Sequence, residues 1–218
     1  KGMNVICCFG FSFCVGGLEG KNSKAPVTNQ KMNRPERRIL ELIHTDVCGP
    51  MKTTSIGGGR YFVSFTDDRT RKSFTYIMKE KSEVLIKLKE FLNEVENELN
   101  STVMMIRSDG GGEYVNRAMR EFLAGKGIRL QLTARNSPEQ NGVAERLNRT
   151  LMEKTRSMLV ESGLGREFWA EALNSATYLR NVSPTQALNG KTPHEAWTGT
   201  QPAVHHLKVF GCAAYVHV

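Results

Sequence analysis

The spacing of apolar and polar residues changes repeatedly along the chain, and each change predicts a new element. Short runs rich in β-branched and aromatic residues predict strands at 42–47, 61–66, 73–78, 103–107 and 128–133, with a further strand at 213–218. Apolar residues at every third or fourth position predict helices over 81–100, 115–124, 141–160 and 166–181. Thr192 and Glu195 have capping-box spacing around Pro193, which predicts a short helix there.

The order of these elements predicts an α/β domain. Three strands and a helix are followed by strand, helix, strand and helix, and a central five-stranded mixed sheet with helices on both sides accommodates that order. We interpret residues 39–185 as the core of this domain and 186–218 as a C-terminal extension that is truncated at its end. Residues 5–14 are apolar without a clear period, and residues 16–38 are polar, basic and contain Gly and Pro, so residues 1–38 are predicted to be poorly ordered.

Composition and charge narrow the classes of partner. The 218 residues include 30 basic and 22 acidic side chains, giving a net charge of +8 and a pI of about 9.4. This excess favours a polyanionic partner but does not establish one. The five cysteines are irregularly spaced, which indicates a reducing, intracellular setting and not a disulfide framework. No apolar run approaches 18 residues, so no membrane span is predicted.

Three carboxylates are the candidate chemical groups. Asp46 lies at a predicted strand end, Asp109 follows a strand in a Gly-rich turn, and Glu145 lies in the first turn of a predicted helix. Carboxylates at strand ends can meet at one edge of an α/β sheet. Each residue also has an ordinary interpretation, since Asp46 and Asp109 suit turns and Glu145 suits a helix start.

If the three meet, their chemistry points to a divalent cation. Mg²⁺ takes oxygen ligands and keeps several waters, so two or three carboxylates are enough to bind it. Two such ions about 4 Å apart activate an attacking oxygen and stabilise the leaving oxygen of a phosphodiester. We therefore predict a site for two Mg²⁺ or Mn²⁺ ions at Asp46, Asp109 and Glu145.

Four segments carry a resemblance to a known family. They are IHTDVCGPM at 43–51, RSDGGGEY at 107–114, SPEQNGVAER at 137–146 and VFGCAAY at 209–215. In order and spacing they resemble the integrase of copia-type LTR retrotransposons, which is a segment of a Pol polyprotein. The match runs from about residue 39 to the end. Thirty-five residues separate Asp109 from Glu145, which is the spacing of that family's D,D-35-E site.

The resemblance implies a fold, an activity and partners. The fold is ribonuclease H-like, and Asp46, Asp109 and Glu145 match the family's catalytic and metal-binding carboxylates. The implied enzyme is an integrase with endonuclease and strand-transfer activity: water attacks during 3′-end processing, and a DNA 3′-hydroxyl attacks during transfer into target DNA. Element ends and target DNA are the implied partners, with a homo-oligomer (dimer or tetramer) as the active form. The implied location is a cytoplasmic particle and then the nucleus.

The chain departs from the family pattern in two places. Gly110 follows Asp109 where the family commonly has Asn. Upstream, Cys14 and Lys21 resemble the end of the family's zinc module, but Gly17 replaces the second cysteine and no histidine precedes Cys14. A structural zinc site needs four ligands, so we predict no zinc and interpret residues 1–38 as the remnant of the module plus a basic linker.

The helix that carries Glu145 is also the predicted DNA-binding element. Helical spacing places Arg149 and Arg156 on the same face as Glu145, and guanidinium groups suit phosphate contacts. The loop 136–142 is predicted to be a mobile flap. A solvated basic face is the alternative. The residues predicted to contact DNA are Gln140, Asn141, Arg146, Arg149, Lys154 and Arg156.

Two other functions remain open from the sequence. A catalytically degenerate or host-adopted fragment would bind nucleic acid through its basic surface without turnover. A ribonuclease H-like nuclease would cut RNA–DNA hybrids, which requires a different substrate groove. His44 shares a strand face with Asp46, and we interpret it as a packing or hydrogen-bonding residue, not as a metal ligand.

Overall fold

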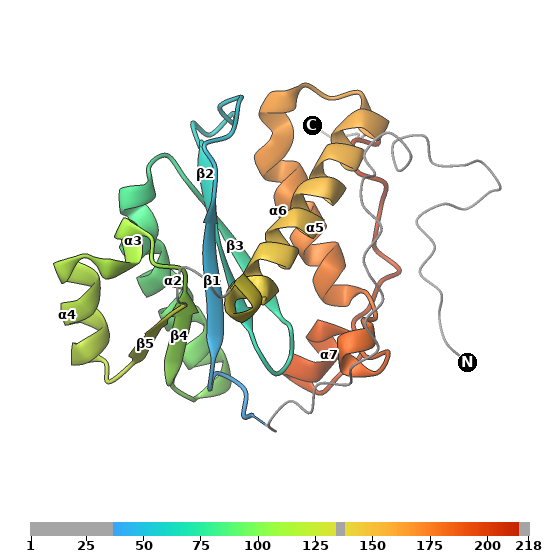
Figure 1. Cartoon of the computed structure of the whole chain (residues 1–218). Helices are drawn as coiled ribbons and strands as arrows, with labels where there is room; N and C mark the ends of the chain where they lie inside the picture. The colour runs from blue at the N-terminus through green and yellow to red at the C-terminus, as the bar shows by residue number, and fades with distance from the viewer. Residues whose placement is uncertain (1–36, 134–137, 214–218) are drawn as a thin grey trace.

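The computed structural model describes residues 37–133 and 138–213, except for the side chains of residues 138–141. The Cys14 segment and the loop residues 134–137 lie outside this part, as does most of the strand predicted at 213–218. Three layers are visible in Figure 1, with the sheet in the middle and helices on either side. Among the described residues, no helix is long and apolar enough to cross a membrane.

The sheet has five strands in the order β3-β2-β1-β4-β5. β1 pairs antiparallel with β2, and β2 pairs antiparallel with β3. β1 and β4 are parallel, as are β4 and β5. This mixed topology confirms the predicted sheet. The strands are β1 (Ile43–Cys48), β2 (Tyr61–Asp67), β3 (Ser73–Met78), β4 (Met105–Ser108) and β5 (Arg129–Leu132).

The helices follow the predicted apolar patterns with some changes at their ends. On one side of the sheet lie α2 (Val84–Leu99), α3 (Gly112–Val115) and α4 (Arg117–Gly125), with a 3₁₀ turn η1 (Lys81–Glu83) before α2. On the other side lie α5 (Pro138–Ser162), α6 (Trp169–Val182) and α7 (Pro193–Thr198). Two further 3₁₀ turns are η2 (Arg166–Phe168) and η3 (Gln186–Leu188).

Two helix predictions need correction. The helix predicted at 115–124 is divided at Asn116, whose side chain accepts a hydrogen bond from the Met119 amide and so caps α4. α5 begins at Pro138 and not at residue 141, so residues 138–142 belong to a helix and the flap prediction is wrong for them. Proline suits the first position of a helix because its missing N–H has no helical partner there.

Two apolar clusters hold the layers together. The larger one packs β1, β2 and β4 against α2 and α4, with the Phe65 and Phe91 rings stacked 4.5 Å apart. Trp197 of α7 joins this cluster against Phe74. The smaller cluster packs Phe62 of β2 against α5 and α6. The sheet is therefore fixed on both faces, and α5 is held across β1 and β2.

Candidate active site

Parallel pairing of β1 and β4 brings two carboxylates to the same end of the sheet. Asp46 lies within β1 and is half-buried, whereas Asp109 directly follows β4 and is exposed. An oxygen of Asp109 accepts a hydrogen bond from the Gly111 amide at 3.2 Å, which steadies the turn. The carboxyl ends of parallel strands form one edge, which is where α/β sheets usually bind ligands.

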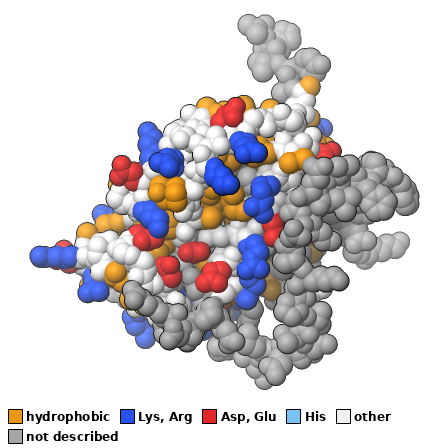
Figure 2. Space-filling view, turned by 45° about the horizontal axis from the view of Figure 1, so that its top comes forward, with side chains coloured by type: hydrophobic (Ala, Val, Ile, Leu, Met, Phe, Trp, Pro, Cys, Tyr) orange, Lys and Arg blue, Asp and Glu red, His pale blue; other side chains and the backbone are white. Residues whose placement is uncertain are grey.

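α5 supplies the third carboxylate. Leu147 and Leu151 are buried against Phe62 and Leu173, which confirms the apolar stripe predicted for this helix. Because that stripe faces the sheet, Glu145 is left exposed. It lies in the second turn of α5, not the first, because the helix starts at Pro138. Figure 2, which looks toward this end of the molecule, shows acidic side chains gathered together with Lys and Arg side chains around them.

Asn148 is a site residue that the sequence reasoning missed. Its side-chain amide donates to Oδ2 of Asp46 at 3.0 Å, so α5 and β1 are joined directly at the carboxylate. Asn148 is buried, and its amide oxygen has no hydrogen-bond partner among the described residues. A polar residue between the buried Leu147 and Leu151 is the signal that could have found it, because buried polar groups normally have a specific partner.

The environment of Asp46 disfavours its charge. Burial raises the pKa of Asp46 to about 6, and the negative charges of Asp109 and Glu145 push it in the same direction. Hydrogen bonds from Asn148 and from the Val47 amide oppose the rise. The three predicted carboxylates are thus close enough to interact electrostatically, which the sequence could not establish.

The donor set suits a hard cation, although the carboxylates are not drawn together. In the part of the chain that the structure describes, no group of three His, Cys, Asp or Glu side chains is arranged to hold a metal ion. The groups that interact with Asp46 are the carboxylates of Asp109 and Glu145 and the side-chain amide of Asn148. Oxygen donors of this kind fit Mg²⁺ or Mn²⁺ better than softer ions.

A buried tyrosine supports the site from the opposite face of the sheet. Tyr114 of α3 is 1% exposed, and its hydroxyl lies 2.8 Å from Oγ1 of Thr45 in β1. Burial raises the pKa of Tyr114 well above its usual value, and the charges of Asp46 and Asp109 add to the rise. This contact fixes the Gly-rich loop after Asp109 to the strand that carries Asp46.

Comparison with known proteins identifies the family. Residues 36–138 match the integrase core domain family. The chain is 42% identical over 218 residues to the Pol polyprotein of transposon TNT 1-94 from Nicotiana tabacum, and 34% identical over 205 residues to that of transposon RE1 from Arabidopsis thaliana. The chain carries an integrase core domain. It is related to the Pol polyproteins of plant copia-type transposons and spans 16% and 14% of the lengths of these two.

Solved structures show the same fold at low sequence identity. A chain of the simian T-cell lymphotropic virus intasome has a TM-score of 0.61 and 15% identity, covering 84% of this chain and 72% of that one. The HTLV-2 integrase catalytic core domain, solved with magnesium, has a TM-score of 0.55 and 16% identity, covering 72% and 95%. The ribonuclease H-like fold expected from the resemblance is confirmed.

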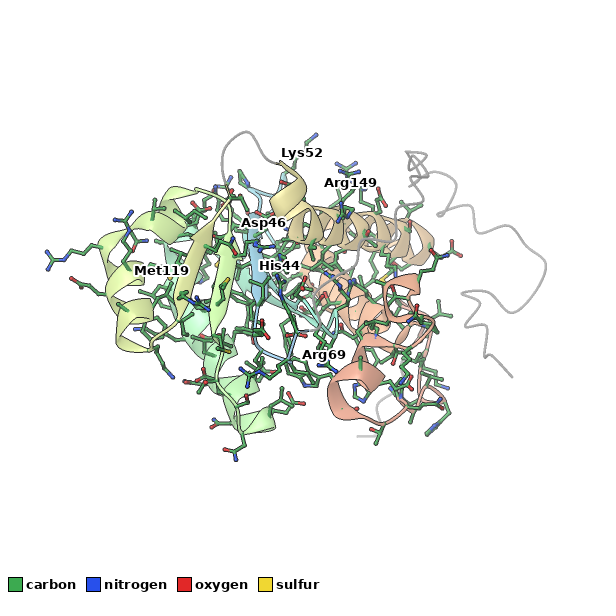
Figure 3. The ribbon with its side chains drawn as sticks, turned by 60° about the horizontal axis from the view of Figure 1, so that its bottom comes forward. His44, Asp46, Lys52, Arg69, Met119 and Arg149 are labelled. Carbon is green, nitrogen blue, oxygen red and sulfur yellow. The ribbon has the colours of Figure 1, made fainter. Side chains whose placement is uncertain are left out.

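The exposed face of α5 carries three of the six predicted DNA contacts of this integrase core. Arg146, Arg149 and Arg156 are exposed, and Lys154 is half-buried. Figure 3 shows Arg149 projecting from α5 away from the sheet, with Lys52 of the β1–β2 loop pointing to the same side. Met152, which shares the helix face of Arg149, packs against the smaller apolar cluster instead. The predicted contacts Gln140 and Asn141 have side chains outside the described part.

His44 has a structural role in the integrase core, as interpreted from the sequence. It is 1% exposed, and its Nε2 lies 2.8 Å from Oδ1 of Asp68. Asp68 also pairs with Arg37 at 2.6 Å and with Arg71 at 3.3 Å. Asp67 accepts hydrogen bonds from the amides of Leu40 and Thr70, as expected of a turn residue. These groups form a paired cluster toward the amino end of β1.

The Gly110 departure has little steric consequence. A Cβ placed on Gly110 would meet no atom within 4 Å, and its backbone is not in the left-handed region. The Cβ of an asparagine would therefore meet open space at this position.

Proposed function

We propose that this chain is the catalytic core of a metal-dependent polynucleotidyl transferase that processes the 3′ ends of transposon DNA and joins them to target DNA. The observation that carries the proposal is the arrangement at Asp46, where Asp109 and Glu145 lie near enough to raise its pKa. The HTLV-2 neighbour solved with magnesium and the viral intasome neighbour support the metal and the DNA substrate.

Asp46, Asp109 and Glu145 would hold the Mg²⁺ or Mn²⁺ ions. When bound, such ions lower the pKa of an attacking hydroxyl and neutralise charge on the leaving oxygen. The chain itself positions the reactants. Asn148 fixes the carboxylate of Asp46 through its 3.0 Å hydrogen bond, and Tyr114 fixes the Asp109 loop to β1. Both contacts lie on rigid elements, which is what an in-line displacement requires.

The basic face of α5 would bind the DNA substrate. Arg149 and Arg156 lie on the exposed side of a helix that already contributes Glu145. Their guanidinium groups would contact phosphates and place a DNA end over the carboxylates without reading its sequence. We also propose the flanking Arg146 and Lys154 as contacts. The same proposal includes a homo-oligomer, because joining two DNA ends needs two active sites. It also includes action in the nucleus, where chromosomal target DNA lies.

A single substitution tests the catalytic assignment. Glu145→Gln keeps the size of the side chain and removes its charge, so we expect nicking and strand transfer with Mg²⁺ or Mn²⁺ to be lost while thermal unfolding is unchanged. Glu171→Gln is the matched control, because Glu171 is exposed on α6, a helix that contributes none of the three carboxylates. Labelled oligonucleotides carrying the element's ends provide the readout on denaturing gels.

The result also separates the proposal from its alternatives. Full activity in Glu145→Gln would rule out the carboxylate mechanism. A folded wild-type protein that binds DNA but shows no turnover would instead support the non-catalytic fragment. Cleavage confined to RNA–DNA hybrids would indicate a ribonuclease.

A further inference from the structure

Part of the sheet beside the carboxylates is left open to solvent. Side chains alternate between the two faces of a strand, and Ile106 of β4 and Leu130 of β5 face the larger cluster with Met119 and Leu123 of α4. The neighbouring side chains of these strands, Arg107 in β4 and Arg129 and Gln131 in β5, therefore point to the opposite face of the sheet, on which α5 lies. α5 covers β1 and β2 on that face, and Figure 1 shows β4 and β5 beyond it. Arg107, Arg129 and Gln131 form this open sheet face.

The open sheet face is cationic and partly preorganised. Arg107 and Gln131 are register partners on adjacent parallel strands. The guanidinium of Arg107 donates to Oε1 of Gln131 from Nε at 3.2 Å and from Nη2 at 2.9 Å. Arg129 is exposed one step along β5 on the same face. Gln131 thus fixes the orientation of the Arg107 guanidinium without neutralising its charge.

Arg107 lacks a carboxylate of its own. Within the described residues it forms no ion pair, whereas Arg37 and Arg71 both pair with Asp68. The Arg107 guanidinium is half-buried and donates to the uncharged side chain of Gln131, so an approaching anion would supply the counter-charge that it lacks. The solvent-facing side of Arg107 is where that anion would lie.

The position of Arg107 relates the open sheet face to the catalytic carboxylates. Arg107 precedes Asp109 by two residues, so both side chains leave the chain on the same face. Two strand residues span about 6.6 Å. In β1, His44 is the register partner of Arg107, and Asp46 lies two residues further toward the same edge. An anion bound at Arg107 would thus lie about two strand residues from the carboxylates, further from the edge of the sheet.

We propose that the open sheet face binds the phosphate backbone of a nucleic-acid strand as it leaves the carboxylates, with Arg107 as the principal contact and Arg129 as the next. This inference rests on the proposed function, because it assigns a path to the same substrate. It places that path across β4 and β5, on the other side of the carboxylates from the basic face of α5. The contacts are to phosphates, so they position the strand without reading its bases.

The test compares DNA binding by single-charge variants of the whole chain. A fluorescent duplex oligonucleotide with a single-stranded 3′ overhang serves as the probe, titrated at several salt concentrations with Ca²⁺ present. Arg107→Gln should weaken binding roughly three- to tenfold and reduce the slope of log affinity against log salt by about one. Arg129→Gln should reduce the slope in the same direction.

Arg117→Gln provides the matched control. It removes the same charge from an exposed arginine on α4, which pairs with Glu121 in the opposite helix layer. We expect its affinity and salt slope to equal those of the wild type. If Arg107→Gln and Arg117→Gln bind alike, the proposal is overturned, since net charge alone then explains both.

Thermal unfolding separates binding from a structural role. Arg107 carries an unpaired charge, so Arg107→Gln should unfold at the same temperature as the wild type or higher. A lower unfolding temperature with an unchanged salt slope would mean that Arg107 only supports the sheet through Gln131, and would contradict the proposal. If the wild type shows no strand transfer, the proposed function is contradicted, but the comparison of salt slopes can still be made. Failure of the proposed function is therefore distinguishable from failure of the proposed phosphate contact at Arg107.

Discussion

The two ends of β1 carry charged clusters that differ in one respect, the presence of counter-charges. Near its carboxyl end, Asp46 lies beside Asp109 and Glu145, and in the described part of the chain none of the three forms an ion pair. Toward its amino end, Asp68 pairs with Arg37, His44 and Arg71. The unpaired charges of the first cluster disfavour the folded state, whereas the ion pairs of the second favour it.

The pKa values express the same contrast. Burial acts on both Asp46 and Asp68 to raise the pKa. At Asp68, hydrogen bonding and charge from His44 and Arg37 outweigh burial and hold the pKa below its usual range. At Asp46, the neighbouring charges are negative and add to burial. Burial disfavours the charge of both carboxylates, and the opposite sign of their neighbours distinguishes a candidate functional group from a structural one.

Removing the charge at the paired end should have the largest effect. Asp68→Asn leaves the buried guanidinium of Arg71 without its counter-charge and also breaks the ion pair with Arg37, so we expect the free energy of unfolding to fall by about 3 kcal/mol. Urea unfolding at neutral pH measures it. Glu90→Gln, which breaks the exposed pair with Lys87, is the control and should cost less than about 0.5 kcal/mol. Equal losses in the two variants would remove the contrast between the clusters.

The same change at the unpaired end should act in the opposite direction. The pKa of Asp46 is about 6 in the folded chain against an ordinary value of 3.8, so the folded state binds the proton more tightly. The stability from this group is present below pH 3.8 and is lost as pH rises through 6. Asp46→Asn should therefore raise the free energy of unfolding of the metal-free protein by about 1–2 kcal/mol at pH 8.

Unfolding curves at pH 4 and pH 8, recorded with a chelator, check this expectation. The gain should shrink toward zero at pH 4, because the wild-type carboxyl is then largely protonated in the folded state. Mg²⁺ should stabilise the wild type and not the variant. A variant that is less stable than the wild type at pH 8 would show that the Asp46 charge is compensated after all.

The smallest effect is expected in the turn beside Asp109. Gly110→Asn places its Cβ in open space, so stability should change by less than about 0.5 kcal/mol. Gly49→Ala is the contrasting variant: Gly49 has a φ of +134°, and an added Cβ would lie 2.6 Å from Cδ1 of Tyr61. We expect it to cost about 2 kcal/mol or more. A large loss from Gly110→Asn would show that this turn is tighter than its geometry indicates.

Much of the fold was predictable because its signals are local. β3 has the predicted bounds, and the apolar stripe of α5 is buried where the spacing placed it. The misplaced start of α5 has a local cause as well: Pro138 was interpreted as a loop residue although it suits a first helical position. The division at Asn116 was missed because a cap within an apolar pattern interrupts the helix without altering its period.

By itself the sequence determined the residue types and their spacing: three carboxylates on three elements, a helix with one buried and one basic side, and a family resemblance that the comparisons confirm. Only the tertiary structure decided which charges are left uncompensated. Asn148 reaches Asp46 from 102 residues away, and in the described part of the chain Arg107 donates to Gln131 and forms no ion pair. The periodicity of apolar residues is a local property of the sequence, whereas burial and Coulomb interactions depend on which segments lie close together in the folded chain.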